Sequence, residues 1–387
     1  MSAPDVLVIG AGITGAAAAL SLAEAGASVE VIDAYGPAAM ASGWTLAGVR
    51  QSGRHPAELP LAQAAVAEWP HLAAKLGAPT HYRQEGNLRL ARDDGEVEII
   101  KRLVADQSAA GLELTFLPTL SDVRTIAPAI SDKVIAASFC PSDGHADPVA
   151  TVTALLAAAE RAGARLRYGE RVRSLEHEGG RITHAVTATR RIAVGAVVIA
   201  GGVHVNDLLA PLGARIPMIV PIVTVVQTEP VAPTLGPVLG VANANLAVRQ
   251  EANGCFRLTS GRETFDGTLE EENGRPVARP RTKQIATTIA RTVEVLPVVG
   301  EARFQAFWGG LLDLTPDSLP VIDHVPGMDN AVVAAGFSGH GFCLGPVTGP
   351  LAADLALGRA PRFDLAAFRF DRLAKLDANA ADLTLHG

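Results

Sequence analysis

The stretch "DVLVIGAGITGAAAALSLAEAGASVEVIDA" at residues 5–34 constrains the fold more than any other part of this 387-residue chain. A short apolar run at 6–9 comes directly before a glycine-rich turn, and such continuous runs are typical of parallel strands buried on both faces. Gly10, Gly12 and Gly15 have the spacing GxGxxG. An alanine-rich helical segment and a second apolar run follow. The pattern predicts a strand, a tight turn, a helix and a second strand.

Each glycine has a physical task in such a unit. Gly10 permits the tight turn, Gly12 lets the backbone approach a pyrophosphate, and Gly15 lets the helix pack close to the strand. The pyrophosphate would lie at the helix N-terminus, where free N–H groups and the helix dipole favour negative charge. Asp33 ends the second strand, where a ribose-binding acid is expected in NAD and FAD proteins alike. The alternative is a structural unit that holds no cofactor.

Composition excludes several other classes of protein. Hydrophobic residues make up 48% and charged residues 19% of the chain, which indicates a globular protein. The net charge of −7 argues against nucleic acid or an anionic membrane as a partner. Cys140, Cys255 and Cys343 form no CxxC pair, so we expect no metal, no disulfide framework and a cytoplasmic location. No basic region precedes the apolar run at 6–25, so we expect neither a signal peptide nor a membrane span.

The next segment carries a resemblance to a known family. Residues 34–69 contain "ASGWTLAGV", which resembles the loop after the second strand in the D-amino-acid-oxidase-like flavoenzymes. Residues 143–176 and 191–213 resemble that family's returns to its nucleotide domain. Residues 307–358 resemble its closing segment, in which a TPDxxP block and a GHG turn recur together. The resemblance covers nearly the whole chain and implies non-covalent FAD as the cofactor.

The resemblance also implies which residues contact FAD. Residues 338–345 would form a loop before a helix at about 346–357, with N–H groups aimed at the pyrimidine edge of the flavin. These donors would stabilise the negative charge of the reduced flavin. The alternative is a glycine-rich turn with no ligand. The implied cofactor-binding residues are Gly10, Gly12, Ile13, Thr14, Gly15, Asp33, Ala34, Ala41, Ser42, Gly43, Ala47, Gly48, Val49, Val172, Gly201, Gly202, Gly336, Ser338, Gly339, His340, Gly341, Phe342 and Cys343.

The expected architecture is α/β plus antiparallel β. Residues 1–80, 143–215 and 300–387 would form a discontinuous Rossmann-type FAD-binding domain. Residues 81–142 and 216–299 would form an interleaved substrate domain on a mainly antiparallel sheet, because they contain alternating runs and an Asn-Gly hairpin pattern. The active site is expected between that sheet and the flavin.

One departure from the family bears on the substrate. Glycine oxidase has a segment resembling "WAGLRP", in which the arginine is expected to bind the substrate carboxylate. This chain reads "WGGLLD" at residues 308–313, so Leu312 stands at the position of that arginine. A leucine cannot make a bidentate bond to a carboxylate. Arg50, Arg54, Arg249 and Arg257 are candidates for this role, and Arg50 is preferred because Gly48 and Val49 would lie near the flavin. His340 would either face the flavin or substrate, or cap its loop.

The activity that the resemblance implies is transfer of a hydride from the carbon beside an amine nitrogen to flavin N5, which gives an imine that hydrolyses. The flavin carries the difficult chemistry, so no protein base is required if the amine binds neutral. A secondary amine or imino acid of the opine, sarcosine or hydroxyproline type is the leading substrate class. The alternatives are a self-sufficient oxidase of free D-amino acids or glycine, and a flavin-binding subunit without turnover. Whether the electrons pass to oxygen or to partner subunits is left open. Because this chain has no cysteine-rich motif, an iron–sulfur or FMN centre would be carried by a partner subunit.

Overall fold

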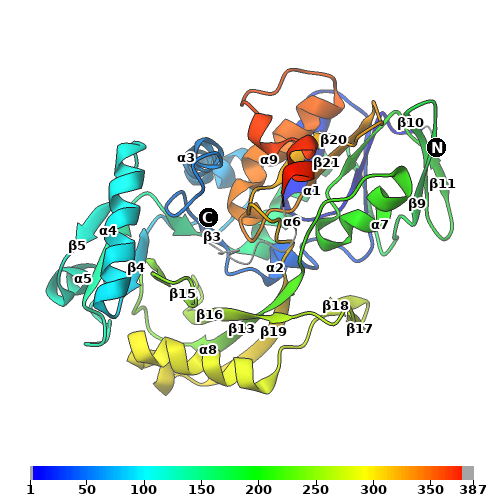
Figure 1. Cartoon of the computed structure of the whole chain (residues 1–387). Helices are drawn as coiled ribbons and strands as arrows, with labels where there is room; N and C mark the ends of the chain where they lie inside the picture. The colour runs from blue at the N-terminus through cyan, green and yellow to red at the C-terminus, as the bar shows by residue number, and fades with distance from the viewer. Residues whose placement is uncertain (1–2, 377–387) are drawn as a thin grey trace.

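The computed structural model describes residues 3–376, and within them two unlike parts lie side by side (Figure 1). The first part is built on a six-stranded sheet in the order β20–β21–β12–β1–β2–β8. Its neighbouring strands run parallel, except that β20 pairs antiparallel with β21. The strands are β1 (Val6–Ile9), β2 (Val29–Asp33), β8 (Arg165–Tyr168), β12 (Ala196–Ile199), β20 (Val321–His324) and β21 (Ala331–Ala335).

Layers of unlike structure cover the two faces of this sheet. Four helices share one buried cluster with side chains of β1, β2, β12 and β21 on one face. A three-stranded antiparallel sheet and a short helix cover the other face. The helices of the first layer are α1 (Ile13–Glu24), α3 (Leu59–Leu76), α6 (Pro148–Arg161) and α9 (Gly341–Ala356). The opposite layer holds α7 (Val205–Leu209), β9 (Ser174–Glu178), β10 (Arg181–Val186) and β11 (Arg191–Ala193).

Helices α1 and α9 lie unusually close together, and small residues make this possible. A Cβ added to Gly345 would lie 2.6 Å from Cγ1 of Ile13, and one added to Gly349 would lie 2.5 Å from Cβ of Ala17. A substitution at either glycine therefore requires the helices to separate. The close contact brings the N-termini of two helices, one from each end of the chain, to the same edge of the sheet (Figure 1).

The second part is an eight-stranded sheet in the order β19–β13–β16–β15–β14–β4–β6–β5. Its pairs are antiparallel except for β14 with β4, which run parallel and join the two predicted insertions into one sheet. Helices α5 (Leu120–Ile126) and α8 (Thr282–Val295) share a buried cluster with one face, and α4 (Asp94–Ala109) packs on β4 and β6. The strands are β4 (Asn87–Ala91), β5 (Thr115–Leu117), β6 (Ala136–Cys140), β13 (Pro221–Pro230), β14 (Val238–Val241), β15 (Ala247–Gln250), β16 (Cys255–Thr264) and β19 (Phe304–Leu311).

Short elements complete the described structure. A helix at Ala41–Trp44 (α2) follows β2, and β3 (Gly48–Val49) pairs with β7 (Gly144–His145). A small hairpin of β17 (Glu270–Glu272) and β18 (Arg275–Val277) extends from the large sheet. Among the described helices, none is long and apolar enough to cross a membrane. Residues 3–376 also contain no cluster of three His, Cys, Asp or Glu side chains arranged to hold a metal ion.

The predicted fold class, α/β with a second, mainly antiparallel sheet, is confirmed. The predicted boundary at 299/300 assigns β19, which begins at Phe304, to the nucleotide part. In the structure this strand is hydrogen-bonded to β13 of the eight-stranded sheet. This strand therefore belongs to the eight-stranded sheet although the sequence resembles the nucleotide segments there. Val172, one of the residues expected to contact FAD, lies in an irregular segment between β8 and β9.

Candidate active site

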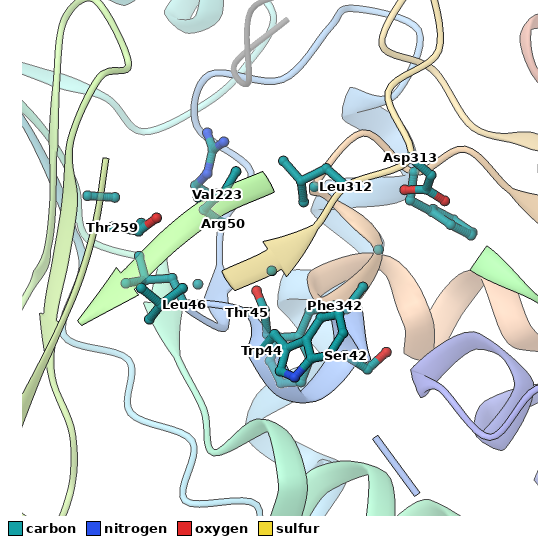
Figure 2. Close-up of a pocket in the computed structure, with 18 of the residues that line it drawn as sticks. Ser42, Trp44, Thr45, Leu46, Arg50, Val223, Thr259, Leu312, Asp313 and Phe342 are labelled. Atoms are coloured by element: carbon teal, nitrogen blue, oxygen red, sulfur yellow. The ribbon is translucent and has the colours of Figure 1, made fainter. Parts of the chain in front are cut away.

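Two adjoining cavities lie beside the glycine turn that follows β1. The larger has a volume of about 250 Å³ and is lined by residues of both sheets (Figure 2). The smaller has a volume of about 160 Å³ and lies beside β1, β2 and the segment around Val172. Their walls share Gly12, Ala41, Ser42, Ala200, Gly202 and Leu311. The two cavities therefore form one elongated space that runs past the glycine turn.

The geometry of Gly10 and Gly15 agrees with the tight turn and the close packing that the sequence predicts, and Gly12 lies at the cavities. Gly10 has a φ of +115°, and a Cβ there would lie 2.3 Å from the carbonyl oxygen of Ala200. A Cβ on Gly15 would lie 2.0 Å from the carbonyl oxygen of Gly10, so only glycine allows this close packing. A Cβ on Gly12 would meet only the side chain of Ser42, at 3.0 Å. Gly12 lines both cavities, so its missing side chain leaves their junction open.

Asp33 ties this turn to the chain that follows β2. Its Oδ2 accepts a hydrogen bond from the N–H of Ala11 at 2.8 Å. Its Oδ1 accepts from the N–H groups of Tyr35 and Gly36 at 2.7 and 2.8 Å. Oδ2 thus retains a lone pair for a further donor, and Asp33 lines the smaller cavity. The ribose-binding role expected of this residue fits its position.

The loop after β2 contributes to the site in two ways. Ala41, Ser42 and Gly48 line the larger cavity, and the Ser42 hydroxyl accepts a hydrogen bond from the N–H of Ile13 at 3.0 Å. The predicted residues Gly43, Ala47 and Val49 do not line either cavity. Ala47 and Val49 are fully buried, and a Cβ on Gly43 would lie 2.0 Å from the carbonyl oxygen of Ala38. These three residues support the conformation of the loop without facing either cavity.

The smaller cavity brings together several other predicted residues. Ala34, Val172, Gly201 and Gly202 all line it. Arg171 lines it too, and its Nη2 donates to the Tyr35 hydroxyl at 3.1 Å while its guanidinium lies 5.6 Å from the centre of the Tyr35 ring. The elongated shape, the acidic Asp33 and the open backbone at Gly12 suit the adenosine end of a dinucleotide.

The second glycine turn approaches the larger cavity from the other end of the chain. Gly339, Gly341 and Phe342 line the cavity, and α9 has no side-chain cap at its N-terminus. The predicted helix start at 346 is wrong, because α9 begins at Gly341 and contains Pro346 and Pro350. Burial against α1 stabilises a helix that glycine and proline content disfavours in isolation. Ser338, with a φ of +52°, and Gly336 form the turn that leads into it and do not line the cavity.

Two predicted residues of this turn lie behind the cavity wall. Cys343 is buried, and its thiol lies 3.4 Å from the carbonyl oxygen of Arg50. His340 is also buried and is not among the lining residues; its Nδ1 lies 2.9 Å from a carboxylate oxygen of Glu58. Burial lowers the pKa of His340 and Arg54 lowers it further, against the raising effect of the Glu58 carboxylate. The structure therefore places His340 beside the Glu58 side chain, which lies at the start of α3 and outside the loop of His340, so this contact is neither of the two predicted arrangements.

Three arginines line the larger cavity. Arg50 and Arg54 follow β3, and Arg89 lies on β4. Burial lowers the pKa of Arg89 to about 10, and burial together with Arg54 and Arg89 lowers the pKa of Arg50 well below its ordinary value. The guanidinium groups of Arg50 and Arg89 are therefore desolvated, and the nearby carboxylate of Asp143 stabilises their charge. This end of the cavity is strongly cationic.

Two buried carboxylates accompany these arginines without entering the cavity. Asp143 accepts from the N–H of Gln51 at 2.8 Å and from the hydroxyl of Ser52 at 2.5 Å. Glu58 lies 3.8 Å from Nε of Arg54, whose Nη1 is buried without a hydrogen-bond partner in the described structure. The carboxylates of Asp143 and Glu58 thus lie close to the arginine cluster.

The other sequence candidates for a carboxylate anchor lie elsewhere. Arg249 and Arg257 are buried and bound to Glu251, and neither lines the cavity. Arg89 was not predicted from the sequence. Its strand was recognised by alternation, but alternation alone did not show which face of the sheet meets the other part of the molecule. Leu312 does line the cavity, so the position of the missing arginine is part of the site (Figure 2).

The remaining wall of the larger cavity is mainly apolar. Asp313 is the acidic residue among the described lining side chains, and its Oδ2 accepts from the N–H of Gly336 at 2.8 Å. Burial raises the pKa of Asp313. This carboxyl group fixes the 336–338 turn. The apolar side chains of the wall include Val223, Val225, Val238 and Leu239 of the eight-stranded sheet, Leu246 just before β15, and Leu46, Phe337 and Phe342 of the nucleotide part.

These features fit FAD. Gly12 leaves the junction of the two cavities open and, as the N-cap of α1, offers no capping side chain; the N–H of Ile13 is bound by Ser42, and α9 has no side-chain cap. Two helix N-termini at one elongated space suit the pyrophosphate and the electron-rich edge of a flavin. Within the predicted binding set, the structure places on the cavity walls Gly10, Gly12, Ile13, Thr14, Gly15, Asp33, Ala34, Ala41, Ser42, Gly48, Val172, Gly201, Gly202, Gly339, Gly341 and Phe342.

Known proteins share both the sequence pattern and the fold. The chain belongs to the DAO family, described as FAD dependent oxidoreductase, which matches residues 5–355. It is 28% identical over 382 residues to glycine oxidase of Geobacillus kaustophilus, covering 95% of this chain and 97% of that protein. It is 27% identical over 320 residues to D-amino acid dehydrogenase of Cereibacter sphaeroides, covering 78% of this chain and 68% of that protein. The crystal structure of L-proline dehydrogenase from P. horikoshii matches with a TM-score of 0.88 and 26% identity, covering 97% of this chain and 98% of that one.

Family membership decides the cofactor that the glycine motif left open. The protein is an FAD-dependent oxidoreductase, and the predicted resemblance is confirmed. The choice of FAD over NAD agrees with a nucleotide part assembled from three separate stretches of the chain.

Proposed function

We propose that this enzyme oxidises the C–N bond of a small amino or imino acid whose carboxylate is held by Arg50 and its neighbours. The observation that carries the proposal is the cluster of Arg50, Arg54 and Arg89 on the wall of the larger cavity. Leu312, on the same wall, stands where the resemblance to glycine oxidase predicts an arginine. Desolvated guanidinium groups bind a carboxylate strongly and with defined geometry.

The bound FAD supplies the hydride acceptor, and the protein supplies position and environment. Arg50 and Arg54 orient the substrate by its carboxylate. The apolar wall of Val223, Val225 and Leu246 excludes water and receives the substrate's carbon chain. The N-terminus of α9 favours negative charge at the cavity edge where Gly339 and Gly341 lie.

The described wall of the larger cavity carries no histidine, lysine or glutamate. The ionisable groups on it are three arginines and Asp313, and Asp313 is bound to the 336–338 turn. The substrate amine must therefore bind neutral or lose its proton to solvent. This supports a hydride-transfer chemistry in which no side chain acts as a general base.

The substrate class remains a proposal. A secondary amine or imino acid of the opine, sarcosine or hydroxyproline type is the leading candidate, because Leu312 departs from the glycine oxidase pattern. A free D-amino acid is the second candidate, favoured because several similar proteins are D-amino acid dehydrogenases. The proposal also includes partner subunits carrying FMN or iron–sulfur centres. It includes a cytoplasmic location as well, with which the three free, buried cysteines are consistent.

The deciding experiment is anaerobic reduction of the bound FAD by a panel of amines, followed in the visible spectrum. The panel contains sarcosine, proline, hydroxyproline isomers, opines and simple D-amino acids. Bleaching by one member identifies the substrate class, and admission of air then separates an oxidase from a dehydrogenase. A yellow protein that no member bleaches would favour a flavin-binding subunit without turnover.

A further inference from the structure

Four side chains of the eight-stranded sheet form a connected group on the side that faces the nucleotide part. Arg249 lies on β15, Glu251 follows it, Arg257 lies on β16 and Trp308 on β19. Glu251 Oε1 binds Nη2 of Arg249 at 2.9 Å and Nη2 of Arg257 at 3.0 Å. The Arg257 guanidinium lies 5.1 Å from the centre of the Trp308 ring. We call these four residues the interdomain clasp.

The clasp binds the nucleotide part at the loop that lines the larger cavity. Nη1 of Arg257 donates to the carbonyl oxygen of Thr45 at 2.8 Å, and Nε1 of Trp308 donates to the carbonyl oxygen of Trp44 at 3.0 Å. Both donors are therefore directed at adjacent carbonyl groups of one loop. Trp44 and Thr45 line the cavity, and Figure 2 shows them beside Ser42 and Phe342.

A second contact of the clasp reaches the strand beside this loop. Nη1 of Arg249 lies 2.9 Å from Nδ1 of His145, a residue of β7, which pairs with β3. Burial and the adjacent Arg249 lower the pKa of His145 to about 3, so Nδ1 accepts a hydrogen bond from the arginine. Glu251 thus holds two arginines, and each of them reaches across to the nucleotide part.

The local contacts show why this loop needs external support. Ala47 has a φ of +59°, a left-handed conformation that costs free energy for a residue with a side chain. A Cβ on Gly310 would lie 3.4 Å from Cβ of Trp44, so the loop rests directly on the backbone of β19. Strained backbone persists only where surrounding contacts determine it. The clasp provides such contacts on one side of Ala47, at Trp44 and Thr45.

We propose that Arg257 and Trp308 are positioning residues that fix the loop at 44–46, and with it the environment of the flavin and the width of the cavity. Arg257 accordingly holds protein backbone and does not bind substrate carboxylate. The proposal depends on FAD binding in this cavity but not on the proposed substrate, because the spectrum and reduction potential of bound FAD are measured without any amine.

The test compares Arg257→Met and Trp308→Phe with the wild-type holoenzyme. Trp308→Phe removes the N–H donor and keeps an aromatic ring. Both variants should shift the reduction potential and visible spectrum of bound FAD, and should slow flavin reduction by the best amine of the panel about tenfold or more, because small misplacements near reacting groups have large effects. Affinity for a non-reactive carboxylate, measured from its effect on the flavin spectrum, should stay within about threefold of wild type, since the carboxylate anchors are untouched.

Two further variants sharpen the comparison. Arg257→Lys keeps a charge and a donor, and should restore part of the wild-type spectrum. Arg191→Met is the matched control, because Arg191 is exposed and pairs with Glu176 within the three-stranded sheet of the nucleotide part. If Arg257→Met abolished carboxylate binding and left the flavin spectrum unchanged, Arg257 would be an anchor and the proposal would fail. It would also fail if the variants lowered only the thermal stability while spectrum, potential and reduction rate stayed as in wild type.

Discussion

Replacing Gly12 with alanine should weaken the binding of FAD while leaving the stability of the fold nearly unchanged. Gly12 has a φ of −75°, which any residue adopts, and an added Cβ would meet only Oγ of Ser42 at 3.0 Å. The protein should therefore fold with little loss of stability. The new methyl group lies at the junction of the two cavities, where the backbone would approach the pyrophosphate.

The expected loss of affinity follows from the hydrogen bonds that this approach allows. Two bonds from N–H groups to a charged phosphate contribute about 1.5–3 kcal/mol each. Their loss would weaken FAD binding by roughly 10²- to 10⁴-fold. Gly12→Ala should consequently purify without colour, and its dissociation constant should be measured by titrating the apoprotein with FAD and following flavin fluorescence.

Gly15→Ala is the matched control for this experiment. Its Cβ would lie 2.0 Å from the carbonyl oxygen of Gly10, an overlap that this tight turn cannot absorb. We expect a loss of stability of about 3 kcal/mol or more, seen in thermal unfolding of the apoprotein. The reasoning would be refuted if Gly12→Ala bound FAD as tightly as wild type, or if it lost its fold to the same extent as Gly15→Ala.

Three further predictions test other parts of the structure. Arg50→Met should raise KM for the substrate roughly tenfold to a hundredfold, because a charge-assisted bond is lost; an unchanged KM would place the carboxylate elsewhere. His145 has a native pKa of about 3 against an ordinary 6.5, so the unfolded state binds its proton first and stability falls as pH drops from about 6.5 to about 3. The slope is about 1.4 kcal/mol per pH unit, and His145→Gln should flatten the acid side of a plot of Tm against pH. Gly349→Leu should lower Tm strongly by forcing α9 away from α1, since a Cβ there already lies 2.5 Å from Cβ of Ala17; a near-normal Tm would contradict the close contact.

The dinucleotide unit could be predicted from the sequence because its information is local. The glycine spacing, the apolar runs and Asp33 all lie within residues 5–34, and each acts on its near neighbours in the chain. The positive φ of Gly10 and the contact of Gly15 with Gly10 confirm the roles assigned to them. The closing segment was recognised in the same way, from motifs at fixed spacing.

Other features depended on contacts between distant segments. The start of α9 was predicted too late, because glycines and prolines disfavour an isolated helix, whereas the close contact with α1 requires small residues there. Arg257 was a reasonable carboxylate anchor from its place on a strand. Its actual partners, Thr45 and Glu251, could not be read from the residues around it.

The sequence by itself determined the fold class, the FAD-binding motifs and the departure at Leu312. Only the tertiary structure decided which side chains face the cavity: it added Arg89, turned His340 toward Glu58 and placed Cys343 behind the wall. The physical reason is that backbone conformation depends mainly on neighbours in the chain. The direction of a side chain toward a cavity depends on how two sheets, built from interleaved segments, lie against each other.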